Sequence, residues 1–169
     1  MLCGFPEADG TAGSLVVRGY DMDIKKRNYW IGVISGAHAQ LGVKGGFIQL
    51  NHGKQAPLQR LRAGDFIIIY SPRDTYPDGD VLQHFTAIGS IMTGDIYQVE
   101  MGPDFKPYRL AVDFIRCHMT PIKPLIHNLA FIKNKVNWGA VFRFGHLKIQ
   151  AEDFKLIAEA MGAREAIKE

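Results

Sequence analysis

The sequence is poor in cysteine and has no long hydrophobic run. Its two cysteines, Cys3 and Cys117, cannot form a disulfide framework and stand at no metal-ligand spacing. No apolar stretch approaches the roughly 20 residues that a membrane helix needs. Residues 1–17 also lack the basic start and apolar core of a signal peptide. We therefore expect a cytoplasmic protein with reduced thiols, no metal site and no membrane partner.

Sequence motifs of the common enzyme classes are missing as well. The chain contains no P-loop, no HExxH or CxxC motif, no nucleophile elbow and no paired acidic motif. No GxGxxG follows the first expected strand, which argues against a dinucleotide-binding fold. We therefore expect a binding protein without catalytic residues or a cofactor.

The length and charge favour a single, mildly basic domain. The chain has 169 residues, a formal net charge of +3 and a sequence pI of about 8.9, which suits one core and is compatible with a polyanionic partner. Residues 1–27 contain four glycines and little periodicity, so we expect a flexible leader there and a domain at 28–165. A solvated basic face explains the charge equally well.

Hydrophobic periodicity and turn residues predict an α+β fold with about six strands. Strands are expected at residues 29–34, 47–50, 66–70, 85–92, 96–100, 108–115 and 141–149. Helices are expected from Gly36 to about Gly45, at 57–63, at 124–132 and at 153–161. Pro72 should end the third strand, Gly145 should interrupt the last one, and the strands at 85–92 and 96–100 should form a hairpin. This order favours a small curled sheet or barrel with helices at its rim.

Polar, cationic and aromatic residues gather where the strands at 29–34 and 66–70 end. Such a set suits a flat polar ligand beside a phosphate, because aromatic walls stack on a base and fixed donors read its edge. The candidate pocket residues are Trp30, Ser35, His38, Asn51, His52, Tyr70, Ser71 and Trp138. The candidate phosphate-binding residues are Lys54, Arg73 and Arg143. Core packing is an equal alternative for the two tryptophans. Helix capping for Ser35 and solvent exposure for Lys54 are favoured over a role in binding.

Four segments, taken in order and spacing, resemble one known family. They read Tyr-Trp-Ile-Gly-Val at 29–33 with Ser35 and His38, Gly-Gly-Phe at 45–47 leading to His-Gly-Lys at 52–54, Leu-Arg-Ala-Gly-Asp at 61–65 with Tyr-Ser-Pro-Arg at 70–73, and Asn-Trp-Gly at 137–139 with Phe142, Arg143 and Gly145. Together they resemble EVE-domain proteins of the PUA-like superfamily, of the short stand-alone type. The resemblance implies a PUA-like curved β-barrel flanked by helices. It also implies kinship with YTH domains, which hold a methylated adenine in an aromatic cage.

The resemblance implies a module that binds DNA or RNA and flips a methylated or hydroxymethylated base into a pocket. We expect such a protein to act as a monomer. Two alternatives remain open at this point. One is a small-molecule or nucleotide-binding protein, or an enzyme, that uses the same pocket. The other is a protein-interaction module that docks an acidic partner on the basic face.

Overall fold

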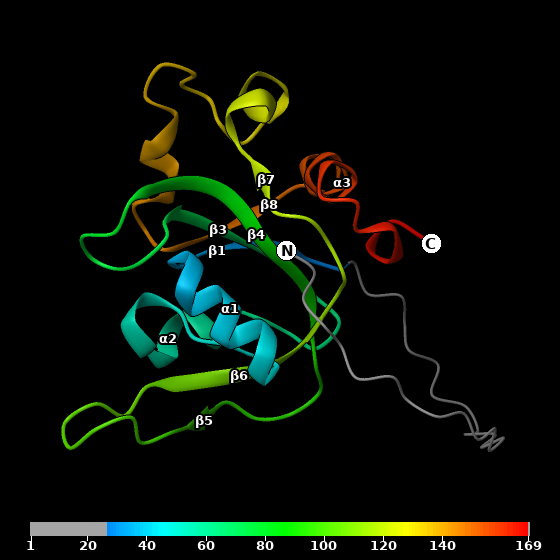
Figure 1. Ribbon diagram of the computed structural model, residues 1–169. Helices are drawn as coiled ribbons and strands as arrows, with labels where there is room; N and C mark the ends of the chain where they lie inside the picture. The colour runs from blue at the N-terminus through cyan, green and yellow to red at the C-terminus, as the bar shows by residue number, and fades with distance from the viewer. Residues whose placement is uncertain (1–26, 169) are drawn as a thin grey trace, which may run out of the picture.

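The computed structural model describes residues 27–168, and it shows one curled sheet with helices on both faces (Figure 1). The strands are β1 (Tyr29–Val33), β2 (Phe47–Ile48), β3 (Phe66–Arg73), β4 (Val81–Ile91), β5 (Tyr97–Gln98), β6 (Tyr108–Phe114), β7 (Thr120–Pro121) and β8 (His146–Ile149). The α-helices are α1 (Gly36–Gly45), α2 (Gln55–Leu58) and α3 (Ala151–Ala160). The 3-10 helices are η1 (Asn51–Gly53), η2 (Lys123–Asn128), η3 (Trp138–Phe142) and η4 (Arg164–Ala166).

The main sheet has the order β2-β6-β4-β3-β1-β8, with β5 paired to β6 and β7 to β4. It curls into a half-barrel, which confirms the expected α+β class and is consistent with a PUA-like fold. The predicted leader at 1–27 lies outside the described residues, apart from Arg27. Within residues 27–168, no helix is both long enough and apolar enough to cross a bilayer.

One strand pair is parallel, and this pair positions the site. β1 runs parallel to β3, in a register from Tyr29 opposite Phe66 to Val33 opposite Tyr70, whereas the other strand pairs are antiparallel. The carboxyl ends of β1 and β3 therefore meet at one edge of the sheet. The chain leaves β1 at that edge into α1, and it leaves β3 there into the hairpin that leads to β4.

The sheet is buried on both faces, so the domain has two cores. We call them the inner core, on the side of α1 and α2, and the outer core, on the side of α3; Figure 1 shows these helices on opposite sides of β1 and β3. The inner core contains Trp30, Ala39, Ile48, Leu50, Leu58, Leu61, Ile67, Ile69, Ala87, Ile91, Leu110 and Val112. The outer core includes Ile31, Phe66, Ile68, Tyr70, Phe85, Ile88, Leu129, Phe142, Phe154 and Ile157. Successive residues of β1 and β3 enter different cores because side chains alternate along a strand.

The predicted boundaries of the first helix are confirmed. Ser35 has extended backbone angles, and its hydroxyl accepts the His38 backbone N–H at 3.4 Å, which is an N-cap. Gly46 ends α1 in the left-handed conformation with φ of 68°, and its N–H donates to the Gly42 carbonyl, as expected for a C-terminal glycine.

The predicted end of the third strand and the predicted hairpin after the fourth were both wrong, because the strands pair differently from what the sequence suggested. Pro72 does not end β3, which continues to Arg73. It falls at a register shift between Ser71 and Arg73, where β1 no longer runs alongside and a missing N–H is tolerated. The segment after β4 does not fold back on β4, because β6 already occupies that edge of β4. The strand after the turn is short and pairs with β6 instead.

Two further segments are 3-10 helices rather than the predicted α-helix and strand. In place of a helix at 124–132 the chain forms η2, and the apolar spacing still buries Leu129 and Ile132. The next backbone donors, Ala130 and Phe131, bond across to the Asp153 carboxylate at 2.8 and 3.0 Å, so they are not available to continue a helix. The predicted strand at 141–149 begins only at His146, after η3.

The buried Asp65 carboxylate links the starts of β1 and β3. It accepts four hydrogen bonds: from the Asn28 backbone and side chain at 3.1 and 3.2 Å, from the Trp30 indole at 2.9 Å, and from the Arg62 backbone at 3.1 Å. Asp65 is a buried polar residue. The bond from the Trp30 indole is also buried, whereas the other three are part-buried, so the indole N–H depends most on Asp65 as its partner.

Replacing Asp65 with alanine should destabilise the domain strongly. We expect Asp65→Ala to lower the free energy of unfolding by about 2–4 kcal/mol, because the buried Trp30 indole and three part-buried donors lose their acceptor together. Urea unfolding measures the change, with Asp95→Ala as the matched control, since Asp95 is exposed in the turn after β4. Equal losses in the two variants would show that the Asp65 hydrogen bonds do not stabilise the fold.

Candidate functional site

A cleft of about 640 Å³ opens at the edge where β1 and β3 end. Its lining comes from the end of β1, the start of α1, the segment of β2 and η1, the end of β3 with its hairpin, the hairpin between β5 and β6, and the segment that joins η3 to β8. The cleft therefore collects parts of the chain that are far apart in sequence, and the sheet fixes their relative positions. Seven of the candidate residues line it, namely Ser35, His38, Asn51, His52, Lys54, Arg73 and Arg143.

His38 gives the cleft a neutral imidazole at neutral pH. Burial lowers the pKa of His38 below its usual 6.5, and the nearby Arg109 guanidinium lowers it further. The His38 Nε2 atom is buried and has no hydrogen-bond partner among the described residues. A buried imidazole nitrogen without a partner is costly, so a hydrogen bond formed to His38 Nε2 would stabilise the site.

Gln49 is a second polar group of the cleft, and the sequence analysis missed it. Its side chain is buried, and its Oε1 accepts a 3.2 Å hydrogen bond from Arg109 Nε. The Arg109 guanidinium lies 3.7 Å from the centre of the Phe47 ring, which supports it by a cation–π contact. The amide of Gln49 is thus held in one orientation at the cleft.

The segment η1 has an unusual backbone that positions Asn51. Asn51 and the following His52 have φ angles of 46° and 58°, a region that residues other than glycine rarely occupy. The Asn51 Nδ2 donates to the Phe144 carbonyl at 3.2 Å. A Cβ atom at Gly145, whose φ is +78°, would lie 1.8 Å from Asn51 Oδ1, so only glycine permits this contact. Such strain concentrates at functional sites in proteins.

The aromatic residues at the cleft differ from those that the sequence predicted. Tyr76 and Phe144 line it with exposures of 71% and 80%, and Phe105 also contributes. The Tyr76 ring lies 4.9 Å from the His52 ring, measured between centroids. Tyr76 belongs to a connecting segment without a periodic pattern, and Phe144 lies in a segment that the sequence pattern assigned to a strand at 141–149, so neither ring was predicted at the cleft.

Trp30, Tyr70, Ser71 and Trp138 do not line the cleft. Trp30 is 4% exposed in the inner core, with its indole bonded to Asp65. Tyr70 stacks on Phe142 in the outer core at 4.1 Å, and Trp138 packs at the edge of that core. Trp30 and Tyr70 therefore lie on opposite faces of one sheet and cannot form one aromatic cage.

Ser71 has a structural partner within the sheet. Its hydroxyl lies 2.8 Å from the Thr86 hydroxyl. Thr86 is the extra residue of β4 at the register shift between Ile69 and Tyr70. The Ser71 side chain is fully buried. Its hydroxyl is hydrogen-bonded to the bulge residue Thr86 and does not face a ligand.

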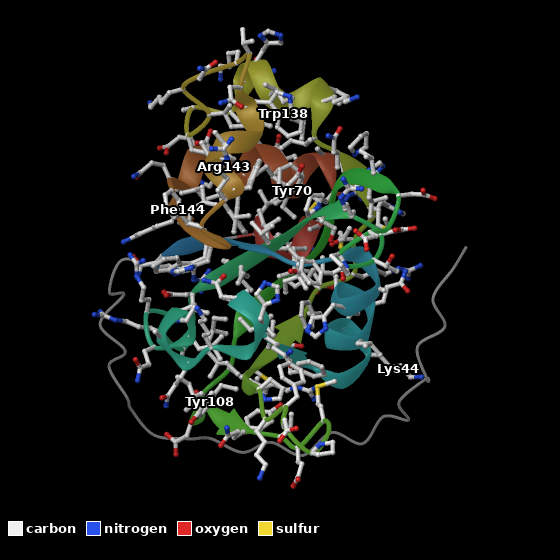
Figure 2. All side chains as sticks on the ribbon, turned by 90° about the vertical axis from the view of Figure 1, so that its left-hand side faces the viewer. Lys44, Tyr70, Tyr108, Trp138, Arg143 and Phe144 are labelled. Carbon is white, nitrogen blue, oxygen red and sulfur yellow. The ribbon has the colours of Figure 1, made fainter. Side chains whose placement is uncertain are left out.

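Three cations stand at the cleft without acidic partners. In the described part of the chain no ion pair involves Lys54, Arg73 or Arg143. Arg73 donates from Nη1 to the Gly79 carbonyl at 2.6 Å, which fastens it to its own hairpin. Figure 2 shows Arg143 next to Phe144 on the segment that follows η3, with Lys44 on a distant part of the surface.

The arrangement suits a flat, partly polar ligand attached to an anion. Rings at the cleft offer apolar surface, while Ser35, His38, Gln49 and Asn51 offer donors and acceptors. The cations offer charge for an attached phosphate. Within residues 27–168, His, Cys, Asp and Glu side chains form no group of three that could hold a metal ion.

Comparison with known proteins places the chain in a family. A family model described as the EVE domain matches residues 28–160. The UPF0310 protein YdcG of Bacillus subtilis is 49% identical over 135 residues, which cover 80% of this chain and 92% of that protein. A UPF0310 protein of Mycobacterium avium is 49% identical over 132 residues, covering 78% and 96%. The solved structure of Rpa0253 from Rhodopseudomonas palustris is similar with a TM-score of 0.48 and 16% identity, covering 80% and 93%. The chain therefore belongs to the EVE-domain family.

Proposed function

We propose that this protein is a nucleic-acid-binding module that takes a modified base, methylated or hydroxymethylated, into the cleft at the ends of β1 and β3. One observation supports this most: the cleft combines aromatic surface, fixed polar groups and cations that form no ion pair within residues 27–168, all at one edge of the sheet. Its volume of about 640 Å³ falls in the range of small-molecule sites, about 300–1,000 Å³. The resemblance of the sequence to base-reading PUA-like domains supports the same function.

The side chains of the cleft take distinct roles in this proposal. His38, Gln49 and Asn51, together with the Ser35 cap, read the polar edge of the base, since an unmatched buried polar group is costly. Tyr76 and Phe105 supply apolar surface for the ring and for an added methyl group. Lys54 and Arg143 contact the flanking phosphates, whereas Arg73 mainly holds its hairpin.

The first test is binding to short oligonucleotides, in DNA and RNA, that carry one modified base or its plain counterpart. We expect tighter binding to at least one of methylcytosine, hydroxymethylcytosine and methyladenine. Lys54→Ala and Arg143→Ala should each weaken binding and reduce the slope of log affinity against log salt by about 1. The reason is that each variant removes one contact that releases a counterion.

Lys44→Ala is the matched control for these variants, because Lys44 is exposed at the end of α1 and does not line the cleft. It should leave both affinity and salt slope unchanged. Equal affinity for the modified and the plain oligonucleotides would indicate non-specific binding to a basic surface and would contradict the proposal. Preference for a free modified nucleotide over every oligonucleotide would instead indicate a small-molecule site.

His38 gives the proposed recognition a definite pH dependence. Because its pKa lies below 6.5, the imidazole is neutral at pH 7.5 and gains a proton only in more acidic solution. We expect the affinity ratio of modified to plain oligonucleotide to be constant down to about pH 6.5 and to fall below it, since protonated Nε2 cannot accept a hydrogen bond. In His38→Gln the affinity ratio should be smaller and should not decline in acid. If the ratio of the variant depends on pH in the same way as that of the wild type does, His38 does not read the base.

A further inference from the structure

Phe144 is the most exposed aromatic side chain in the described part of the chain, and it stands at the mouth of the cleft. Its exposure is 80%, whereas Phe142, two residues earlier, is buried in the outer core. Figure 2 shows Phe144 beside Arg143, on the segment that leads into β8. A single exposed apolar residue is common in proteins, so the case for a function depends on how this one is held and on its neighbours.

The backbone that carries Phe144 is fixed on both sides. The Asn51 side chain donates to the Phe144 carbonyl at 3.2 Å, from the strained segment η1. The next residue, Gly145, accepts from the Val33 N–H at 2.8 Å and donates to the Phe142 carbonyl at 3.2 Å. Phe144 is therefore an exposed ring on a backbone that is anchored to the end of β1, close to the cleft.

Two further cations, Arg60 after α2 and Lys148 on β8, do not line the cleft. The Arg60 Nη1 lies 3.2 Å from Nε2 of His146, and Arg60 and Lys148 lie 5.5 and 6.0 Å from the centre of the Trp30 ring. Burial and the Arg60 charge lower the pKa of His146, so its Nε2 accepts from Arg60. No ion pair in residues 27–168 involves Arg60 or Lys148. The segment that carries Phe144 thus joins Arg143, at the cleft, to β8, which carries Lys148 and lies close to Arg60.

We propose that Phe144 is a wedge that enters a nucleic-acid duplex and fills the space in the stack left by the base that turns into the cleft. This inference rests on the proposed function and specifies its partner as a base-paired duplex that continues past the cleft. Apolar side chains inserted between bases are an established means of opening a stack. A ring on an anchored backbone also replaces part of the stacking that the extruded base loses. Arg60 and Lys148, outside the cleft, then contact phosphates of the continuing strand.

The experiment compares three ligands that carry the modified base preferred by the wild type. They are a fully paired duplex, the same duplex with the modified base mispaired, and the free modified nucleoside. Phe144→Ala should lose about tenfold in affinity for the paired duplex, less for the mispaired duplex, and nothing for the nucleoside. The reason is that a mispaired base costs less to extrude and a nucleoside needs no extrusion. Phe144→Leu should retain most of the affinity, because leucine also serves as a wedge.

Leu41→Ala is the matched control, since Leu41 is an exposed apolar residue of α1 outside the cleft; it should bind all three ligands as the wild type does. An equal loss on duplex and nucleoside would overturn the wedge and make Phe144 a wall of the pocket. Unchanged duplex affinity in Phe144→Ala, or a wild type that binds only single strands, would also overturn it while leaving base recognition intact. A wild type without any preference for a modified base would overturn the wedge together with the proposed function.

Discussion

The parallel pairing of β1 with β3, fastened by the buried Asp65, is the constraint on which the rest of the structure depends. Antiparallel strands are joined by tight turns, but a parallel pair needs a long connection and a fixed register. Here the connection contains α1, β2, η1 and α2. The Asp65 carboxylate, at the start of β3, holds the Asn28 backbone and the Trp30 indole at the start of β1. The two strands consequently begin together and also end together.

The cleft follows directly from that alignment. Because β1 and β3 end at the same edge, the cap of α1 and the hairpin after β3 lie side by side; the Ala37 N–H donates to the Asp74 carbonyl at 2.7 Å. The strained η1 segment and the Gly145 turn add the opposite wall, joined by the hydrogen bond from Asn51. The cleft is therefore framed by backbone contacts and by a desolvated histidine, both of which exist before any ligand binds. A site that is organised in advance loses less entropy on binding.

Residue pattern alone predicted the framework and the place of the cleft, but not its aromatic residues. The apolar run at 29–33, the Ser35 cap and the Gly46 stop follow from local chemistry, and the structure has them in place. Trp30 and Tyr70 were chosen by residue type, although strand alternation assigns them to opposite faces once Trp30 is paired with Ile67. That pairing depends on the parallel register, which no short-range pattern reveals. Tyr76, Phe105 and Phe144 lie in connections whose positions depend on the whole sheet, and Gln49 owes its role to its contact with Arg109.

In the proposed function, the edge shared by β1 and β3 receives the base. Amide chemical shifts of the ¹⁵N-labelled protein, followed during titration with a free modified nucleoside, test it most directly. We expect the largest changes at the amides of Ser35, His38, Asn51 and Gly145, and no change on the surface around Lys44. Changes centred on another surface, or no changes with any of the modified nucleosides, would contradict it.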